Sequence, residues 1–203
     1  MPYVREVILT TLSPKNEPHL APIGLIAAGE DWIIAPFYPS QTLANLREVP
    51  EAVANYVDDV RIFAGCLTNR RDWPLLPAAE VRPPRLAAAL AHAELTVVSV
   101  EENPTRPRFR CRIIAQSMHR PFQGFNRAKA AVIEAAILLS RRHILPGAEI
   151  AQAIAHWRPL IEKTAGPEEQ TAWEWLMEAF AEQEQAHPDA LPRPSAPGDG
   201  TSP

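Results

Sequence analysis

The sequence lacks the motifs that mark common metal and nucleotide sites. Its 203 residues include only two cysteines, Cys66 and Cys111, which form no CxxC pair, and its six histidines form no HxxxH or HExxH pair. Zinc sites use such spacings, so we expect no metal site and two buried, reduced thiols. The absence of GxxxxGKS/T and GxGxxG excludes a P-loop and a Rossmann fingerprint.

An excess of positive charge and long apolar runs are also missing. The chain has 20 Lys and Arg against 24 Asp and Glu, a net charge of −4, whereas nucleic-acid binding needs a basic surface. No apolar run is long enough to span a bilayer. The start, MPYVREVILTTL, is interrupted by Arg5 and Glu6 and is no signal peptide. We therefore expect a cytoplasmic protein that binds neither nucleic acid nor membrane.

Proline is abundant, with 22 residues. After Ala186 the chain combines Pro, Gly, Ser and Asp with almost nothing to bury, which predicts a disordered tail over 187–203. The stretch 72–84 is also rich in proline and is expected to be a loop.

The order of the remaining patterns predicts an α+β chain, a barrel with a helical appendage. β-branched and alternating segments dominate the first half, and apolar residues at helical spacing dominate the second. We expect residues 1–120 to form the barrel domain and 121–186 a helical subdomain packed on it. The expected strands are 4–12, 19–28, 32–36, 52–57, 94–100 and 108–118. The expected helices are 40–48, 59–69, 85–92, 126–145, a segment around 150–161 that Pro159 should kink or restart, and one beginning at Pro167.

The strand 108–118 alternates an apolar face with a cationic face that carries Arg108, Arg110 and Arg112. The cationic face is either a ligand site or a solvated face with cross-strand pairs to Glu101 and Glu102.

GFNRAK, residues 124–129, places cations at the start of an almost apolar helical segment. Asn126 is a good N-cap, so Arg127 and Lys129 fall in the first turn, where the positive end of the helix dipole disfavours them. A bound phosphate or carboxylate would turn this repulsion into attraction, with Arg120 as a third cation. The alternative is pairing with acidic side chains elsewhere in the fold.

PFYPSQTLANL, residues 36–46, contains a second helix start. Ser40 is the expected N-cap, and Ser40, Gln41 and Thr42 bring two hydroxyls, an amide and free backbone N–H groups together. Such a start can hold a phosphate by hydrogen bonding alone. Because Ser and Thr begin many helices, an ordinary capped N-terminus is the alternative.

Five segments in a fixed order cover most of residues 1–180: TTLSPKNEPHLAPIG (10–24), PFYPSQTLANL (36–46), NYVDD (55–59), RPFQGFNRAKAAVIEAAIL (120–138) and EKTAGP (162–167). This set resembles an uncharacterised family of flavin-binding proteins of methanogens and one-carbon-metabolising bacteria. That family is part of the FMN-binding split-barrel superfamily, with the flavin reductases and pyridoxamine-phosphate oxidases. The sequence departs from the family pattern mainly over 73–84 and in the tail.

The resemblance implies an antiparallel, Greek-key-like split β-barrel that binds FMN, and a homodimer with the flavin near its interface. It implies that the SQT start holds the FMN phosphate and that the second strand lies along the isoalloxazine ring. The cluster around GFNRAK would reach the same phosphate from the partner subunit or bind a second, anionic substrate. The implied cofactor-binding residues are Pro22, Gly24, Ser40, Gln41, Thr42, Asn45, Asn55, Asp58, Arg120, Asn126, Arg127 and Lys129.

Two functions follow from the resemblance and stay open. The first is an FMN-dependent oxidoreductase acting on a small molecule, with a nicotinamide donor or a pterin-like substrate. The second is a non-catalytic flavin-binding protein for storage, sensing or assembly. Flavin carries the reactive centre itself, so the sequence indicates no catalytic residue. His19 is the one titratable group that we would place near the ring, and a merely packed or exposed histidine is the alternative.

Overall fold

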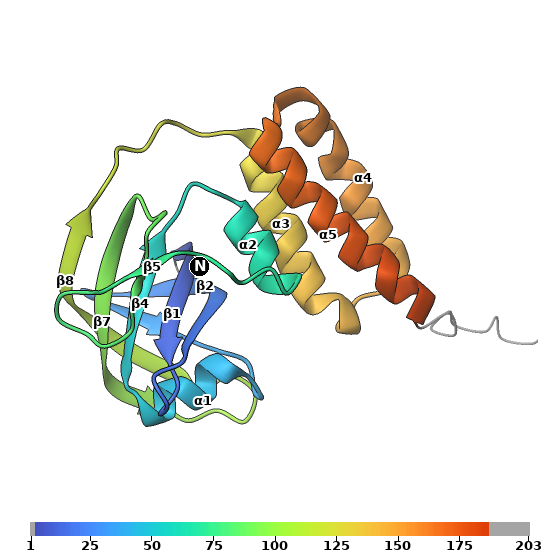
Figure 1. Cartoon of the computed structure of the whole chain (residues 1–203). Helices are drawn as coiled ribbons and strands as arrows, with labels where there is room; N and C mark the ends of the chain where they lie inside the picture. The colour runs from blue at the N-terminus through green and yellow to red at the C-terminus, as the bar shows by residue number, and fades with distance from the viewer. Residues whose placement is uncertain (1–2, 187–203) are drawn as a thin grey trace, which may run out of the picture.

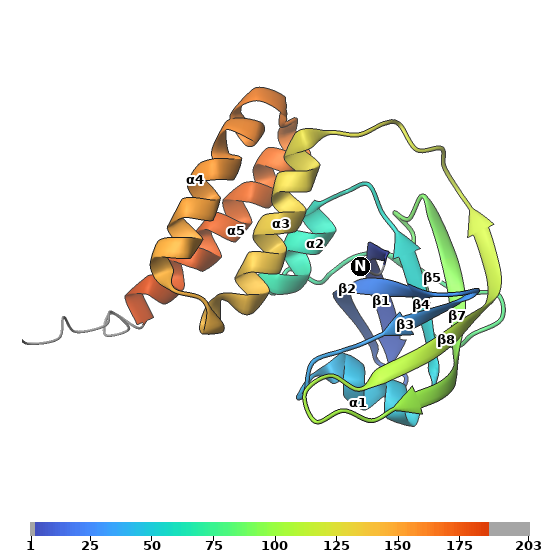
Figure 2. The same ribbon diagram turned by 180° about the vertical axis from the view of Figure 1, so that it is seen from behind.

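The computed structural model describes residues 3–186, so the predicted disordered tail lies outside the described residues. Figure 1 shows a barrel with a helical part at its side. In both Figure 1 and Figure 2, α1 lies at the end of the barrel opposite the start of α3. The elements are β1 (Val4–Leu12), β2 (Pro18–Ala28), β3 (Asp31–Ile34), α1 (Gln41–Glu48), β4 (Glu51–Tyr56), α2 (Arg61–Leu67), β5 (Leu75–Leu76), β6 (Arg85–Leu86), β7 (Ala91–Glu101), β8 (Arg108–Met118), α3 (Arg127–Arg141), η1 (Arg142–Ile144), α4 (Gly147–Thr164) and α5 (Pro167–Ala186).

Six antiparallel strands close into a barrel in the order β1-β2-β3-β8-β7-β4, which confirms the predicted α+β class. Alternation along β1 turns Val7 and Leu9 inward, where they join Leu25, Leu95 and Phe109 in the barrel core. Leu43 and Leu46 of α1 belong to the same cluster, so α1 closes one end of the barrel.

A second core joins the outer side of the barrel to the helices. Ile8 of β1 and Leu20 of β2 pack with buried residues of α2, α3 and α5, including Ile62, Val132 and Leu176. The helix α2 comes from the barrel half of the sequence, and yet it packs within the helical cluster. The barrel and the helical part therefore share one core.

The helix predicted over 85–92 is wrong. The segment forms the short strand β6 and the start of β7, because buried polar side chains of β4 and β7 bind its backbone and that of the preceding loop. Asn55 Oδ1 accepts from Leu86 N at 2.7 Å. The Glu94 carboxylate accepts from the N–H groups of Ala79, Glu80 and Val81 at 2.6–3.0 Å. These tertiary bonds outweigh the helix preference of an Ala- and Leu-rich run.

The other predicted helices are present with shifted ends. The helix predicted over 126–145 divides into α3 and η1, and α4 continues through Pro159 without restarting. Both cysteines are buried and free, as expected. Burial raises the pKa of Cys66 to about 11 and that of Cys111 to about 12, so both thiols stay protonated near neutral pH.

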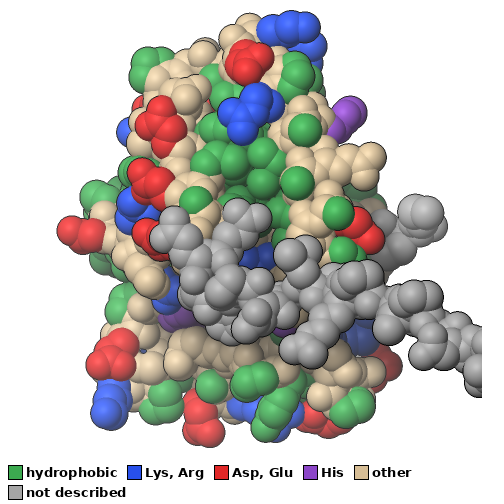
Figure 3. Space-filling view, turned by 90° about the vertical axis from the view of Figure 1, so that its right-hand side faces the viewer, with side chains coloured by type: hydrophobic (Ala, Val, Ile, Leu, Met, Phe, Trp, Pro, Cys, Tyr) green, Lys and Arg blue, Asp and Glu red, His purple; other side chains and the backbone are tan. Residues whose placement is uncertain are grey.

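The helical part is only loosely closed on its outer side. In α4 Ile161 is the one fully buried residue, although the helix has 18 residues. Figure 3 looks onto this side and shows hydrophobic side chains along its middle, with charged side chains mostly toward the margins. Among the helices of residues 3–186, none combines the length and apolar character needed to cross a bilayer.

Candidate functional site

The start of α1 carries backbone donors that the protein does not use. Ser40 is the N-cap, and its Oγ accepts from Leu43 N at 3.3 Å. Within the part of the chain that the structure describes, the N–H groups of Gln41 and Thr42 donate to no protein acceptor. The first turn holds no acidic side chain. The positive end of the dipole and two free N–H groups therefore make this start suitable for an anion.

Side-chain hydrogen bonds link this helix start to β1. Gln41 Nε2 donates to Asn45 Oδ1 at 2.7 Å, and Asn45 Nδ2 donates to Thr11 Oγ1 of β1 at 3.0 Å. Asn45 is 1% exposed and Thr42 is 3% exposed, whereas Gln41 is exposed. Asn45 therefore ties the helix to the barrel, and Gln41 lies at the surface.

The longer helices other than α1 have starts less suited to an anion. In α3 the Asn126 side chain already accepts from Ala128 N and Lys129 N at 2.7 and 3.3 Å. In α4 and α5 acidic residues occupy the first turn, namely Glu149, and Glu168 with Glu169. Negative charge at those positions repels an anion.

Asn126 caps α3 as predicted, but the cations that follow it have different surroundings. Lys129 Nζ lies 2.7 Å from Asp58 Oδ2 and 3.8 Å from Glu169 Oε1. Lys129 therefore pairs with acidic side chains, which is the alternative given for this cluster. Arg127 is exposed, and Arg120 is exposed and donates to the carbonyl oxygen of Ala88. Contact of these two arginines with an anion stays a prediction.

Gly24 and Asn55 each lie close to other residues of the chain. A Cβ on Gly24 would lie 2.8 Å from Val4 Cγ1 and 3.1 Å from Glu6 Oε1, so any other residue there would require those side chains to move. Asn55 is fully buried, and its Nδ2 donates to Ile8 O and Thr10 Oγ1 at 3.0 Å. With Leu86 N on its Oδ1, the Asn55 amide is occupied inside the chain. Pro22 is half-buried on β2 opposite Ile8.

The arginine face of β8 carries ion pairs, as the second of its two interpretations predicted. Arg108 pairs with Glu101, and Arg110 and Arg112 both pair with Asp31, each at 3.5 Å. Glu102 instead pairs with Arg47 of α1 at 2.8 Å.

His19 is half-buried, and burial, followed by the charge of Arg71, lowers its pKa. Residues 3–186 contain no cluster of three His, Cys, Asp or Glu side chains that could hold a metal.

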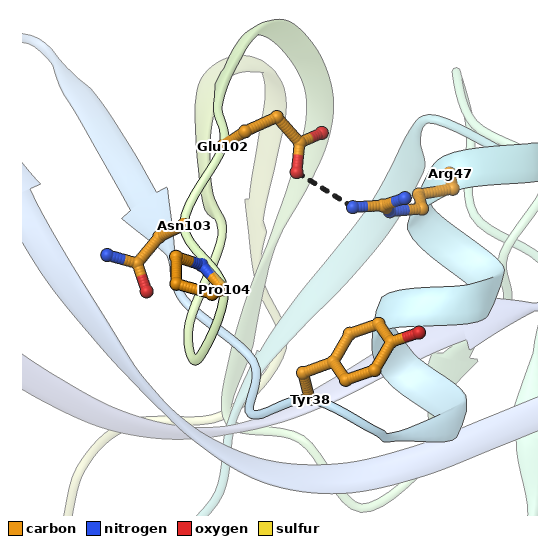
Figure 4. A pocket seen from close by; sticks show the side chains of 5 residues that line it. All are labelled: Tyr38, Arg47, Glu102, Asn103 and Pro104. Atoms are coloured by element: carbon orange, nitrogen blue, oxygen red, sulfur yellow. Dashed lines mark hydrogen bonds and ion pairs between the residues drawn. The ribbon is translucent and has the colours of Figure 1, made fainter.

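A shallow depression of about 380 Å3 lies between α1 and the turn that joins β7 to β8. Its lining residues are Tyr38, Arg47, Glu102, Asn103 and Pro104. Figure 4 shows Tyr38 and Arg47 on the α1 side and the other three on the turn, with the Arg47–Glu102 pair spanning the gap. Arg47 and the turn were not among the predicted site residues, because no sequence pattern links position 47 to position 102.

Two family models match the chain. One is the N-terminal domain of "Protein of unknown function (DUF447)", over residues 5–120, and the other is "Protein of unknown function (DUF447)", over 126–178. The chain belongs to the DUF447 family. No curated protein matches it.

Solved structures show which fold this DUF447 chain has. An FMN-bound DUF447 protein of Methanosarcina mazei is 21% identical, with a TM-score of 0.76 over 87% of this chain and 94% of that one. The 2-nitrobenzoate 2-nitroreductase NbaA of Pseudomonas fluorescens is 20% identical, with a TM-score of 0.50 over 58% of this chain and 64% of that one. These likenesses confirm the predicted split β-barrel with C-terminal helices.

Proposed function

We propose that the chain binds FMN and that the start of α1 holds the phosphate. The observation that carries the proposal is the pair of unused N–H groups of Gln41 and Thr42 beside the Ser40 hydroxyl, in a first turn without acidic residues. Phosphate is one of the anions that such a start binds. The FMN-bound relative from Methanosarcina mazei supports the choice of FMN over other phosphates.

The other predicted residues would take different parts under this proposal. Asn45 and Asn55 are buried and bonded within the chain, so they would position α1 and the strands rather than touch the cofactor. Pro22 and Gly24 would lie along the ring. Arg120, Asn126 and Arg127 would approach the flavin from a partner subunit, because the start of α3 lies away from α1 within one chain.

We further propose that the protein is an oxidoreductase acting on a small molecule, with a nicotinamide or pterin-type electron partner. When bound, FMN supplies hydride and single-electron transfer. The chain's own residues would bind the phosphate and fix the position of the ring. No side chain of the chain is assigned a proton in the reaction.

A proline substitution isolates the proposed contact. Gln41 is the first residue of α1, where proline fits the helix and removes, besides the side-chain amide, an N–H group that has no helical partner. We expect Gln41→Pro to weaken FMN binding about tenfold, since a hydrogen bond to a charged group contributes about 1.5–3 kcal/mol. Gln41→Ala is the matched control, because it removes the side-chain amide and keeps the N–H.

The measurement is a fluorescence titration of apoprotein with FMN and with riboflavin, which lacks the phosphate. Riboflavin affinity should be equal in Gln41→Pro and Gln41→Ala. Equal FMN affinity in the two variants would show that the phosphate lies elsewhere.

Turnover is tested separately, by anaerobic addition of NADH or NADPH to the holoprotein. Loss of the visible flavin absorbance supports an oxidoreductase, and an unchanged spectrum with every donor favours a non-catalytic flavin protein.

A further inference from the structure

The segment that leads into α1 is held by the turn between β7 and β8. Asn103 Oδ1 accepts from the N–H groups of Thr105 and Arg106, both at 2.9 Å, and so fixes the shape of the turn. Tyr38 N donates to Thr105 O at 2.9 Å, two residues before the N-cap of α1. The pairing of β3 with β8 is thus extended toward the helix start.

The Arg106 side chain also holds the segment that leads into α1. Its Nε and Nη2 donate to the same carbonyl oxygen, that of Ala35, at 3.0 and 2.7 Å. Its Cζ lies 4.3 Å from the centre of the Phe37 ring, within the range of a cation–π interaction. One side chain therefore fixes both Ala35 and Phe37, and with them the direction in which the chain enters α1.

The charge of Arg106 has no acidic partner in the structure. Among residues 3–186 no carboxylate lies within ion-pair distance of its guanidinium, although the side chain is half-buried. Burial lowers the pKa of Arg106, and the charges of Arg141 and Arg108 lower it further. The Ala35 carbonyl oxygen and the Phe37 ring are therefore the groups that compensate the burial of this charge.

We infer that Arg106 is a positioning residue for the phosphate-binding start of α1. The inference rests on the proposed function. It holds that the forked guanidinium, bonded to Ala35 and stacked on Phe37, keeps the N–H groups of Gln41 and Thr42 directed at the phosphate. Lysine cannot replace it, because an ammonium group lacks the planar fork that makes two bonds and a stack at once.

Two substitutions separate this role from a simple effect of charge. Arg106→Lys keeps the charge and loses the fork, and Arg106→Gln loses both. If Arg106 positions α1, both should weaken FMN binding by about tenfold while the affinity for riboflavin stays within about twofold of the parent. If Arg106 acted only through its charge, Arg106→Lys would bind FMN like the parent, and the inference would be wrong.

Arg108→Gln is the matched control, since Arg108 lies two residues further on and, among the described residues, pairs with the exposed Glu101 alone. It should bind FMN like the parent. The readout is the ratio of FMN to riboflavin affinity, which a general loss of stability does not change. If Arg106→Gln does not fold, Phe37→Leu tests the contact between Arg106 and Phe37 from the other residue.

Parent protein that fails to bind FMN overturns the proposed function and this inference together. Parent protein that binds FMN, with an unchanged ratio in the Arg106 variants, overturns this inference alone.

Discussion

Lys129 lies in the first turn of α3, where the helix dipole opposes its charge. Two carboxylates offset that cost, and they come from distant parts of the chain: Asp58 precedes α2, and Glu169 lies in the first turn of α5. Glu169 also accepts from Gly166 N at 2.9 Å. The starts of α3 and α5 and the chain entering α2 are therefore joined by one ion-pair cluster.

We predict that Lys129→Gln lowers the free energy of unfolding by about 1 kcal/mol, the upper part of the range for solvent-accessible pairs. Its side chain is 22% exposed, so the pair with Asp58 is screened less than one at the open surface. Urea unfolding of parent and variant checks this value, with Lys15→Gln in the exposed β1–β2 turn as the control. A variant as stable as the parent, or more stable, would show that the dipole outweighs the two carboxylates.

At the scale of elements, the loop between β5 and β6 is held to the barrel by a chain of polar side chains, of which Glu94 and His92 are buried. Glu94 accepts from three loop N–H groups, and its Oε1 lies 3.1 Å from His92 Nε2. His92 Nδ1 lies 2.8 Å from His119 Nε2, at the end of β8. Since ionised Glu94 only accepts, His92 donates to it from Nε2, and its Nδ1 is hydrogen-bonded to His119 Nε2. One hydrogen-bond chain thus connects the loop with the segment leading to α3.

This chain predicts that acid weakens the fold. Burial alone would raise the pKa of Glu94, but the N–H donors and His92 outweigh it and lower that pKa, so its stabilisation is lost as pH falls through the folded-state value. Burial, then the charges of Arg85, His92 and Arg120, lower the pKa of His119. Below about pH 6.5 the unfolded chain therefore takes up a proton that the folded chain resists. Both effects have the same sign.

Urea unfolding at pH 7 and pH 5 measures the contribution of His119. We expect the parent to lose more stability between these pH values than His119→Gln does. His143→Gln, an exposed change on η1, should behave like the parent. Equal losses in parent and His119→Gln would mean that His119 takes up its proton as readily in the fold as in the unfolded chain.

At the scale of the whole molecule, the two predicted anion sites do not meet within one chain. Figures 1 and 2 show α1 at one end of the barrel and the start of α3 in the helical part, away from α1. Large apolar side chains are exposed on β7, on β8 and on the segment from 119 to 126, including Val98, Ile114, Met118, Phe122 and Phe125. Phe125 is fully exposed. Exposed apolar residues in such number favour a protein interface.

We predict a homodimer that covers these side chains and brings the start of α3 of one subunit toward α1 of the other. Light scattering should give about twice the 22.5 kDa of one chain. The double variant Met118→Glu with Phe125→Glu should shift the mass to that of one chain, because charge is costly to bury in an apolar contact. Ile144→Glu, an exposed change on η1, is the control. A parent mass near 22.5 kDa at micromolar concentration would contradict the prediction.

Local patterns were sufficient to predict most of the fold. A β-branched, apolar composition predicted β1 over 4–12, and period-two alternation predicted β8 over 108–118, both with the observed bounds. The caps Ser40 and Asn126 predicted the starts of α1 and α3. These signals depend on neighbours within one or two turns of the chain, so the sequence contains them directly. The helix predicted over 85–92 failed because Asn55, which is distant in sequence, binds Leu86 N, and because Glu94 binds the backbone of the preceding loop.

By itself the sequence determined the class of fold, the strand and helix order, and one helix start suited to a phosphate. Only the tertiary structure decided which charges are free. In the fold Lys129 forms an ion pair with Asp58, and the Asn55 amide is hydrogen-bonded within the chain. Arg106 donates to the carbonyl oxygen of Ala35 and stacks on the Phe37 ring. The reason is physical. Hydrogen bonds and ion pairs act over a few ångströms, and closing the barrel brings together residues that are tens of positions apart in the sequence.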